Sequence, residues 1–293
     1  MERLAQTIVD GIADGSLYAA LALALVLIFR TTGVVNFAQG EMAMVSTFVA
    51  WSLLEAGLPL GAAIAVALAF AFVLGMAVER IVIRPVEGRG PLTLAIVTLG
   101  LYILLNSAAG WIWGFNNRGF PSVFPSDSLS VGGVDIAVES LGIVVVLLVV
   151  VAALFLLLER TRIGLALRAV STNPESARLC GISVGRTLMV GWGLASVLGA
   201  LAGVLIAPRI FLDPNLMGGV LIYAFAAATL GGFDSPVGAV IGGWAIGLSE
   251  ALASTYVDFI GSDLEILVPL TVILVVLLVR PAGLFGRREV VRA

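Results

Sequence analysis

The chain has 293 residues, of which 60% are hydrophobic and 12% are charged, and its formal net charge is −3. A soluble domain is roughly 45–50% apolar and about 25% charged, and its surface helices need a polar face that several stretches of this chain lack. The composition therefore excludes an ordinary water-soluble protein and predicts a chain that lies in lipid.

Missing residue types exclude several kinds of chemistry. The sequence has no histidine, all 16 of its basic residues are arginine, and Cys180 is its one cysteine. It therefore cannot form a histidine acid–base pair, a Schiff-base lysine, a P-loop lysine or a histidine-ligated metal site. A disulfide within the chain is also excluded. We expect no catalytic residue, no metal site and no ATPase site in this chain.

The first apolar run is interpreted as a retained span. Asp10 and Asp14 come before it, Arg3 is the basic residue near the start, and the run continues into the letters NFAQGE. A cleaved signal peptide has a more basic start and a small-residue cleavage site after its apolar stretch. We therefore expect this segment to stay in the membrane.

Apolar runs of suitable length predict the spans, because a helix crosses the roughly 30 Å hydrocarbon core in about 20 residues. The clear runs are 58–78, 91–115, 142–158, 187–208 and 266–279. The regions 8–54 and 214–252 each hold two shorter runs around a polar break, which indicates broken or re-entrant helices. We predict an all-α membrane protein, with one transmembrane domain over 1–293 built as a polytopic bundle of eight or nine transmembrane helices.

The arginines predict an orientation, because basic residues near span ends stay on the cytoplasmic side. Twelve of the 16 arginines lie in three segments, 80–89, 160–186 and 280–292. All three can be cytoplasmic if the region 214–252 crosses twice or enters and leaves from one side. We then expect a cytoplasmic tail over 280–293 and an external loop over 116–140. The N-terminus lies outside if 8–54 makes two crossings and inside if it makes one.

Small residues recur at helical spacing in the later part of the chain. They are Ala195, Gly199, Gly203 and Ala207, and the pairs Gly238/Gly242 and Gly243/Gly247. Such stripes let helix backbones approach closely in lipid, where van der Waals packing replaces the hydrophobic effect. They predict close packing either within the chain or at an interface with another subunit.

The polar loop 159–186 carries the signals of a short helix: an N-cap, a proline and an acid in the first turn, and a glycine after the last. These residues are Asn173, Pro174, Glu175 and Gly181. They predict a two-turn helix over 174–180, preceded by an amphipathic piece over 163–170. Such a helix either docks into a groove on a soluble partner or ties two spans together.

The short helix also carries a family resemblance. Glu175, Ser176 and Ala177, followed after three residues by Gly181, resemble the E-A-A-x-x-x-G loop of permease subunits of bacterial ABC importers. Ser176 departs from that pattern, since the family has alanine there. The blocks NFAQGE, ERIVIRPVEGRGPLTLAIVTLGL, TLGGFDSPVGAVIGGWAIGLSEAL and LLVRPAGLFG extend the likeness nearly from end to end. Together they are similar to the LivH-type permease family of branched-chain amino-acid importers.

This resemblance implies a function and a set of partners. The chain would be a permease subunit for leucine, isoleucine and valine in the bacterial inner membrane. Its coupling loop 159–186 would dock on the ATPase through Asn173, Pro174, Glu175, Ser176, Ala177 and Gly181. The partners would be a LivM-like second permease, two cytoplasmic ATPase subunits that bind ATP and Mg, a periplasmic substrate-binding protein and membrane lipid, without nucleic acid. Related permeases for urea or short amides share these blocks, so the substrate stays open, as does homodimeric pairing.

Polar side chains at membrane depth are candidates for the translocation pathway, because they face protein or water. Asn36, Gln39 and Glu41 cluster in the break after the first run. They either line the pathway or form a cytoplasmic turn in which Asn36 caps the next helix. Glu250 ends the second run of its region and faces the pathway or the interface, and Asn106 could simply bond across helices.

The break TLGGFDSPVGA supplies hinge candidates. Gly231, Gly232 and Pro236 interrupt the helix, and Asp234 and Ser235 can cap the next one. The segment is either a hinge near the pathway or a tight turn between two half-spans.

Two other classes of protein fit the sequence less well. An ion-gradient-driven secondary amino-acid transporter would place acidic groups well inside continuous spans, and the five clear spans have none. An intramembrane protease needs a serine with a base or paired aspartates. Asp234 and Asp258 flank a span instead of facing each other, so the sequence does not favour a protease.

Overall fold

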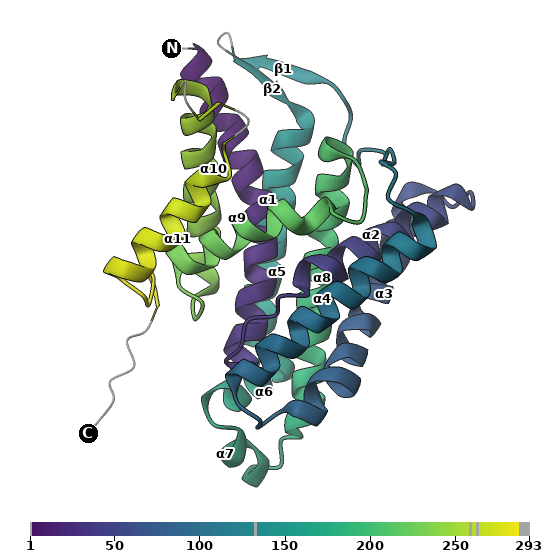
Figure 1. The fold of residues 1–293 in the computed structure, drawn as a ribbon, viewed down its shortest axis with the longest axis vertical. Helices are drawn as coiled ribbons and strands as arrows, with labels where there is room; N and C mark the ends of the chain where they lie inside the picture. Colours follow the sequence, from purple (N-terminus) through teal and green to yellow (C-terminus); the bar gives the residue numbers. More distant parts are fainter. Residues whose placement is uncertain (1, 132–133, 258–259, 262–263, 287–293) are drawn as a thin grey trace.

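The computed structural model describes residues 2–131, 134–257, 260–261 and 264–286, which form one helical bundle (Figure 1). The α-helices of this part are α1 (Glu2–Thr32), α2 (Gln39–Glu55), α3 (Leu60–Val78), α4 (Pro91–Trp113), α5 (Val138–Arg160), α6 (Arg162–Thr172), α7 (Pro174–Leu179), α8 (Val184–Ile210), α9 (Leu216–Gly231), α10 (Pro236–Tyr256) and α11 (Leu267–Val279). Asp258 and the tail arginines after residue 286 lie outside the described residues.

The number of long helices is smaller than the number of crossings expected. Within the described ranges, six helices are long and apolar enough to cross a membrane: α1, α3 with its continuation to Val86, α4, α5, α8 and α10. The helices α2, α9 and α11 have 17, 16 and 13 residues, short of the roughly 20 that a full crossing takes. A polytopic helical membrane fold is confirmed, whereas eight or nine crossings are not.

The segment expected as a loop over 116–140 contains a small hairpin. Strands β1 (Ser128–Val131) and β2 (Val134–Ala137) pair antiparallel, and α5 begins directly after β2. The all-α description therefore has one minor exception. Likewise, most of the loop 159–186 is helical, because α6 and α7 fill it.

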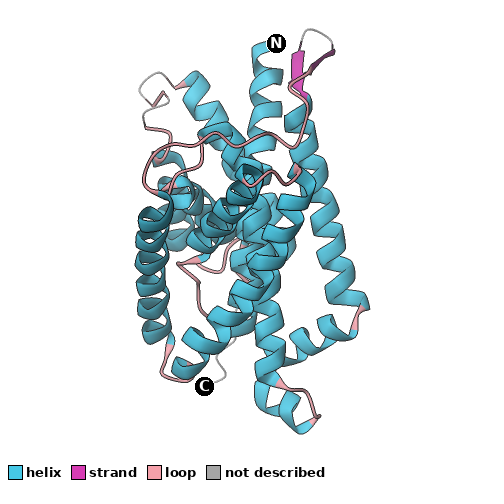
Figure 2. Ribbon diagram, turned by 90° about the vertical axis from the view of Figure 1, so that its right-hand side faces the viewer, coloured by secondary structure: helices cyan, strands magenta, loops and turns pink. Residues whose placement is uncertain are grey.

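The two central helices are α1 and α8. The apolar window of α1 is 83% buried and that of α8 is 72% buried, whereas those of α4 and α5 are each 22% buried. Lipid is an apolar solvent, so helices on the outside of such a bundle need no polar face. Most helices run along the long axis of the bundle, as Figure 2 shows.

Glycines allow these helices to approach closely. A Cβ atom on Gly243 of α10 would lie 2.5 Å from the Cβ and 2.7 Å from the Cα of Ala19 in α1. On α8, a Cβ on Gly199 would lie 3.4 Å from the Cβ of Ala43 in α2, and Gly203 faces the same helix. The small residues predicted from the sequence therefore pack helix against helix inside the chain.

The basic segments share one end of the bundle. Figure 1 shows α6, α7 and the connection between α3 and α4 at one end, and the N-terminus and the β1–β2 hairpin at the other. The segments 80–89 and 160–186, which hold eight arginines, therefore lie on the same side, as the sequence predicts. Because α1 leads from the hairpin end to the α7 end, the N-terminus and α7 lie at opposite ends.

Candidate functional site

The short helix α7 forms as the sequence predicts. The side chain of Asn173 accepts a hydrogen bond from the backbone N–H of Ser176 (2.9 Å), and Pro174 occupies the first turn. At the other end Gly181 has φ 83°, and the backbone N–H groups of Gly181 and Ile182 donate to the carbonyls of Arg178 and Ala177. This pair of bonds is a Schellman motif, in which glycine supplies the left-handed residue.

Ala177 fixes α7 to the bundle, whereas the other side chains of α7 are exposed. Ala177 is 3% exposed and packs with Val170, Val184 and Leu188 of the neighbouring helices. Pro174, Glu175, Ser176 and Arg178 are exposed, and Leu179 is 90% exposed. Beside them lies a cavity of about 640 Å³, whose lining is Arg84, Glu87, Gly88, Thr172, Asn173, Pro174, Glu175 and Arg178.

Behind this cavity an ion pair connects two long helices. Glu79 is 1% exposed and lies in a π-helical turn (Glu79–Ile83) that continues α3. The guanidinium of Arg84 binds its carboxylate (2.6 Å) and also donates to the carbonyl of Gly185 (2.6 Å) at the start of α8. Arg84 therefore connects the end of α3 to the start of α8. The contact between Arg84 and Gly185 could not be predicted from the sequence, because 101 positions separate the two residues.

The polar cluster in the break between α1 and α2 is buried in protein. Asn36 and Gln39 are fully buried, and Glu41 is 1% exposed. The N-cap of α2 is Ala38 and not Asn36, whose side chain instead accepts a hydrogen bond from the backbone N–H of Ala38 (3.1 Å). Gln39 donates to the carbonyl of Ala195 (3.0 Å), which joins α2 to α8. Asn36 borders a cavity of about 10 Å³, barely enough for one water. A pathway role for Asn36, Gln39 and Glu41 stays a prediction.

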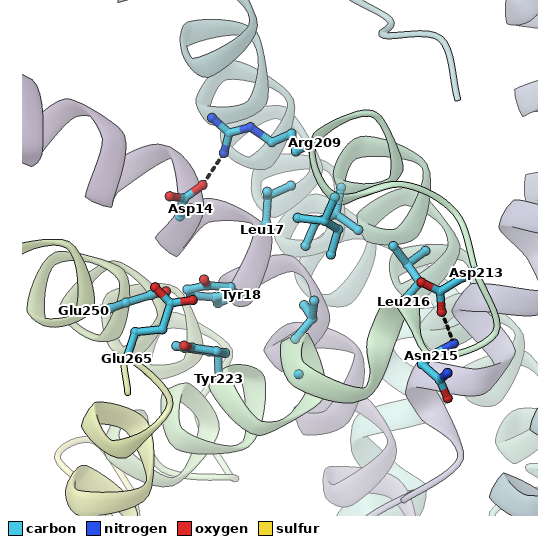
Figure 3. A pocket seen from close by; sticks show the side chains of 14 residues that line it. Asp14, Leu17, Tyr18, Arg209, Asp213, Asn215, Leu216, Tyr223, Glu250 and Glu265 are labelled. Atoms are coloured by element: carbon cyan, nitrogen blue, oxygen red, sulfur yellow. Dashed lines mark hydrogen bonds and ion pairs between the residues drawn. The ribbon is translucent and has the colours of Figure 1, made fainter. Parts of the chain in front are cut away.

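Glu250 lines another cavity, of about 560 Å³, which is open on one side and bordered by α1, α8, the connection from α8 to α9, α9, α10 and the turn before α11. The rings of Tyr18 and Tyr223 stack there, with centroids 4.6 Å apart. The carboxylates of Glu250 and Glu265 lie beside these rings, as Figure 3 shows. Among the candidates for the pathway, Glu250 is therefore the one that faces a cavity of ligand size.

The cavity has more acidic than basic groups. Asp14 and Arg209 form an ion pair, and Asp213 accepts a hydrogen bond from the backbone N–H of Asn215. Burial, and then the negative charge of Asp14, raise the pKa of the Glu265 carboxyl. The hydroxyls of Tyr18 and Tyr223 interact with the Glu250 carboxyl, whose buried Oε2 atom has no hydrogen-bond partner among the described residues. An unpaired acceptor of this kind is costly unless a donor arrives.

The hinge candidates form a tight turn between α9 and α10. Gly232 has φ 99°, and the hydroxyl of Ser235 accepts from the N–H of Gly238 (3.0 Å), so Ser235 is the N-cap of α10 as expected. The N–H groups of Leu284 and Phe285 donate to the carbonyls of Leu230 and Gly231. These bonds hold the turn against the segment after α11. Motion at Gly231, Gly232 and Pro236 stays a prediction.

Comparisons with known proteins agree along almost the whole chain. The family model described as "Branched-chain amino acid transport system / permease component" matches residues 7–277. The high-affinity branched-chain amino acid transport system permease proteins BraD of Pseudomonas aeruginosa and LivH of Escherichia coli are each 29% identical, over 97% of this chain and 96% of their own length. A probable branched-chain amino acid transport permease protein LivH of Methanocaldococcus jannaschii is 33% identical, over 92% of this chain and 89% of its own.

Proposed function

The chain belongs to the family of permease components of branched-chain amino acid transport systems, and from that premise we propose its place in an importer. It is the membrane-spanning subunit of an ATP-driven importer of leucine, isoleucine and valine in the bacterial inner membrane. Separate subunits bind ATP and Mg and hydrolyse the nucleotide. This agrees with a sequence that lacks the lysine of a P-loop.

The observation that carries this proposal is α7, a helix with one anchoring side chain and an exposed outer face. Two ATPase subunits dock on α7 of this chain and on its counterpart in a LivM-like second permease. Arg84, Glu87, Glu175 and Arg178 supply both signs of charge beside α7, which suits a polar interface that must move. Closure of the ATPase pair would displace α7, and the Arg84 contacts would pass the motion to α3 and α8.

The remaining topology follows from the same placement. The α7 end of the bundle and the C-terminus face the cytoplasm, and the hairpin end faces a periplasmic substrate-binding protein. That protein delivers the substrate. Identifying its ligand would therefore show whether the importer carries branched-chain amino acids or an amide such as urea.

One alternative has an observation in its favour. Glu41 and Glu250 lie within helices of the bundle, where a carrier driven by an ion gradient would place its titrating groups. Reconstitution separates the two functions. An importer takes up leucine only when the ATPase subunits and ATP are present, whereas uptake that persists without them would establish the carrier.

The coupling role of α7 is tested in the complete transporter, reconstituted with its ATPases and binding protein. We expect Glu175→Arg and Gly181→Trp to lower substrate-stimulated ATP hydrolysis about tenfold or more, as the loss of an interface contact worth about 1.4 kcal/mol would. The matched control is Glu55→Arg, the same change of charge at an exposed residue at the end of α2, away from both α7 and the β1–β2 hairpin. Normal stimulated hydrolysis in both α7 variants would refute the assignment.

A further inference from the structure

The cavity around Glu250 has the size and shape of a small-molecule site. Its volume of about 560 Å³ falls within the roughly 300–1,000 Å³ that is usual for ligand pockets. Its residues come from four helices and two connecting segments, and its polar groups point inward from several sides (Figure 3). Apolar side chains line the rest, among them Leu17, Ile206, Leu216 and Val220.

The polar groups of this cavity call for a donor that carries positive charge. The buried Oε2 atom of Glu250 lacks a partner, and the carboxylate of Glu265 lies nearby. The rings of Tyr18 and Tyr223 stand beside both carboxylates, and an aromatic face attracts a cation. In the described part of the chain, no three acidic or cysteine side chains are grouped closely enough to hold a metal ion. An ammonium group, with three N–H donors, suits this arrangement better than a metal.

A carboxylate could be bound on another side of the same cavity. The guanidinium of Arg209 pairs with Asp14 and, at 4.0 Å, with Glu139, and it donates to the hydroxyl of Ser140 at 3.4 Å. A guanidinium has five N–H donors, so these contacts leave donors for another carboxylate. Figure 3 shows Arg209 apart from the pair Glu250 and Glu265, with Asp14 between the two groups and the apolar residue Leu17 beside them. The cavity thus offers separate places for an ammonium, a carboxylate and an apolar tail.

We propose that this pocket binds the transported amino acid inside the permease, and that Glu250 holds its ammonium group. Glu265 and the two tyrosines assist Glu250, Arg209 binds the substrate carboxylate, and the apolar walls receive the branched tail. The proposal rests on the importer function proposed above and adds a binding site to it. Asp14 lies about 18 Å along α1 from the helix start, at a rise of 1.5 Å per residue. The pocket therefore lies closer to the hairpin end of the bundle than α7 does. This position suits a substrate that arrives from outside.

Two adjacent glycines of α9 provide a direct test. Gly219 lines the pocket and Gly218 does not, and a Cβ added at either position meets no atom within 4 Å. Gly219→Cys and Gly218→Cys are made separately in a Cys180→Ser background, and the complete transporter is treated with a cationic thiol reagent without ATP. Leucine at ten times its Kd leaves about one tenth of the sites empty. We expect it to slow modification of Gly219→Cys about tenfold and to leave Gly218→Cys unchanged.

The ammonium assignment is tested with an analogue and a variant. The hydroxy acid that corresponds to leucine has a hydroxyl in place of the ammonium, so it should not protect Gly219→Cys at the same concentration. Adding Glu250→Gln should raise the leucine concentration for half-protection about tenfold or more, since a charge-assisted hydrogen bond is lost. If Glu250→Gln fails to assemble with its partner subunits, the comparison of leucine with the hydroxy acid still decides.

The outcomes separate this inference from the importer function. No protection by leucine, or equal protection by the hydroxy acid, would overturn the proposed site, while ATP-dependent leucine uptake by the same preparation would leave the importer standing. Absence of that uptake in the unsubstituted transporter would instead overturn the function on which the site depends.

Discussion

At the scale of single residues, buried polar side chains connect the helices around α2. Asn106 of α4 donates to the carboxylate of Glu41 (3.3 Å) and to the carbonyl of Pro214 (2.8 Å), the residue before the turn into α9. Glu41 is 1% exposed, so its carboxylate has no access to bulk water. In such surroundings, the loss of a donor costs more than the hydrogen bond itself contributes.

We therefore expect Asn106→Leu to destabilise the transporter by about 1–3 kcal/mol, because it leaves a buried carboxylate and a carbonyl unpaired. The measurement is the melting temperature of the purified complex. Glu41→Gln is the control, since it keeps the shape of the side chain and removes the charge. The double variant Glu41→Gln with Asn106→Leu should lose less stability than the two single changes together. A melting temperature unaltered by Asn106→Leu would contradict this account.

Single residues differ most in how much the sequence predicts about them. Asn36, Gln39, Glu41 and Glu250 stand out in the sequence because they interrupt apolar runs. Which residues they pair with does not follow from the sequence, because Gln39 bonds to a residue 156 positions away and Asn106 reaches Glu41 across 65 positions. For the same reason the stacking of the two tyrosines in the Glu250 cavity could not be predicted from the sequence.

At the scale of elements, the close packing of α1 against α10 depends on glycines. Gly243 faces Ala19, and a Cβ on Gly15 would lie 2.9 Å from the Cα of Trp244. The indole N–H of Trp244 donates to the hydroxyl of Ser16 (2.9 Å), a contact that this closeness permits. Both helices contribute to the cavity around Glu250, so their spacing determines its shape.

We expect Gly243→Val to push α1 and α10 apart and to cost about 1–3 kcal/mol or more, as overpacking does. The yield and melting temperature of the assembled transporter measure this effect. Gly218→Val on α9 is the matched control, because its added atoms begin in open space. Equal yields and melting temperatures for the two variants would show that the close approach is not needed.

Elements with local signals were predictable, and elements set by distant contacts were not. The helix α7 follows from Asn173, Pro174 and Gly181, whose capping acts within a few residues. The number of crossings does not follow from the sequence, because α2, α9 and α11 are too short for length to separate a span from a re-entrant helix. Those helices are defined by what they pack against.

At the scale of the whole molecule, the two ends of the bundle differ in charge. The end with α6 and α7 collects basic segments, whereas the β1–β2 hairpin lies beside Asp127 and contains Asp135. The sequence could predict this separation, because arginine near span ends acts over the whole membrane thickness and needs no tertiary contact. The sequence did not decide on which side of the membrane the N-terminus lies. The structure places it at the hairpin end.

This polarity predicts which surfaces an impermeant thiol reagent can reach. Ser128→Cys in β1 and Arg162→Cys at the start of α6 are exposed positions, and each is tested in a Cys180→Ser background. In right-side-out membrane vesicles the reagent should modify Ser128→Cys and spare Arg162→Cys, because the α7 end faces the interior. Inside-out vesicles should give the reverse. Modification of both residues from the same side would contradict the arrangement, and a reversed pattern would put α7 on the side away from ATP, where it could not couple transport to hydrolysis.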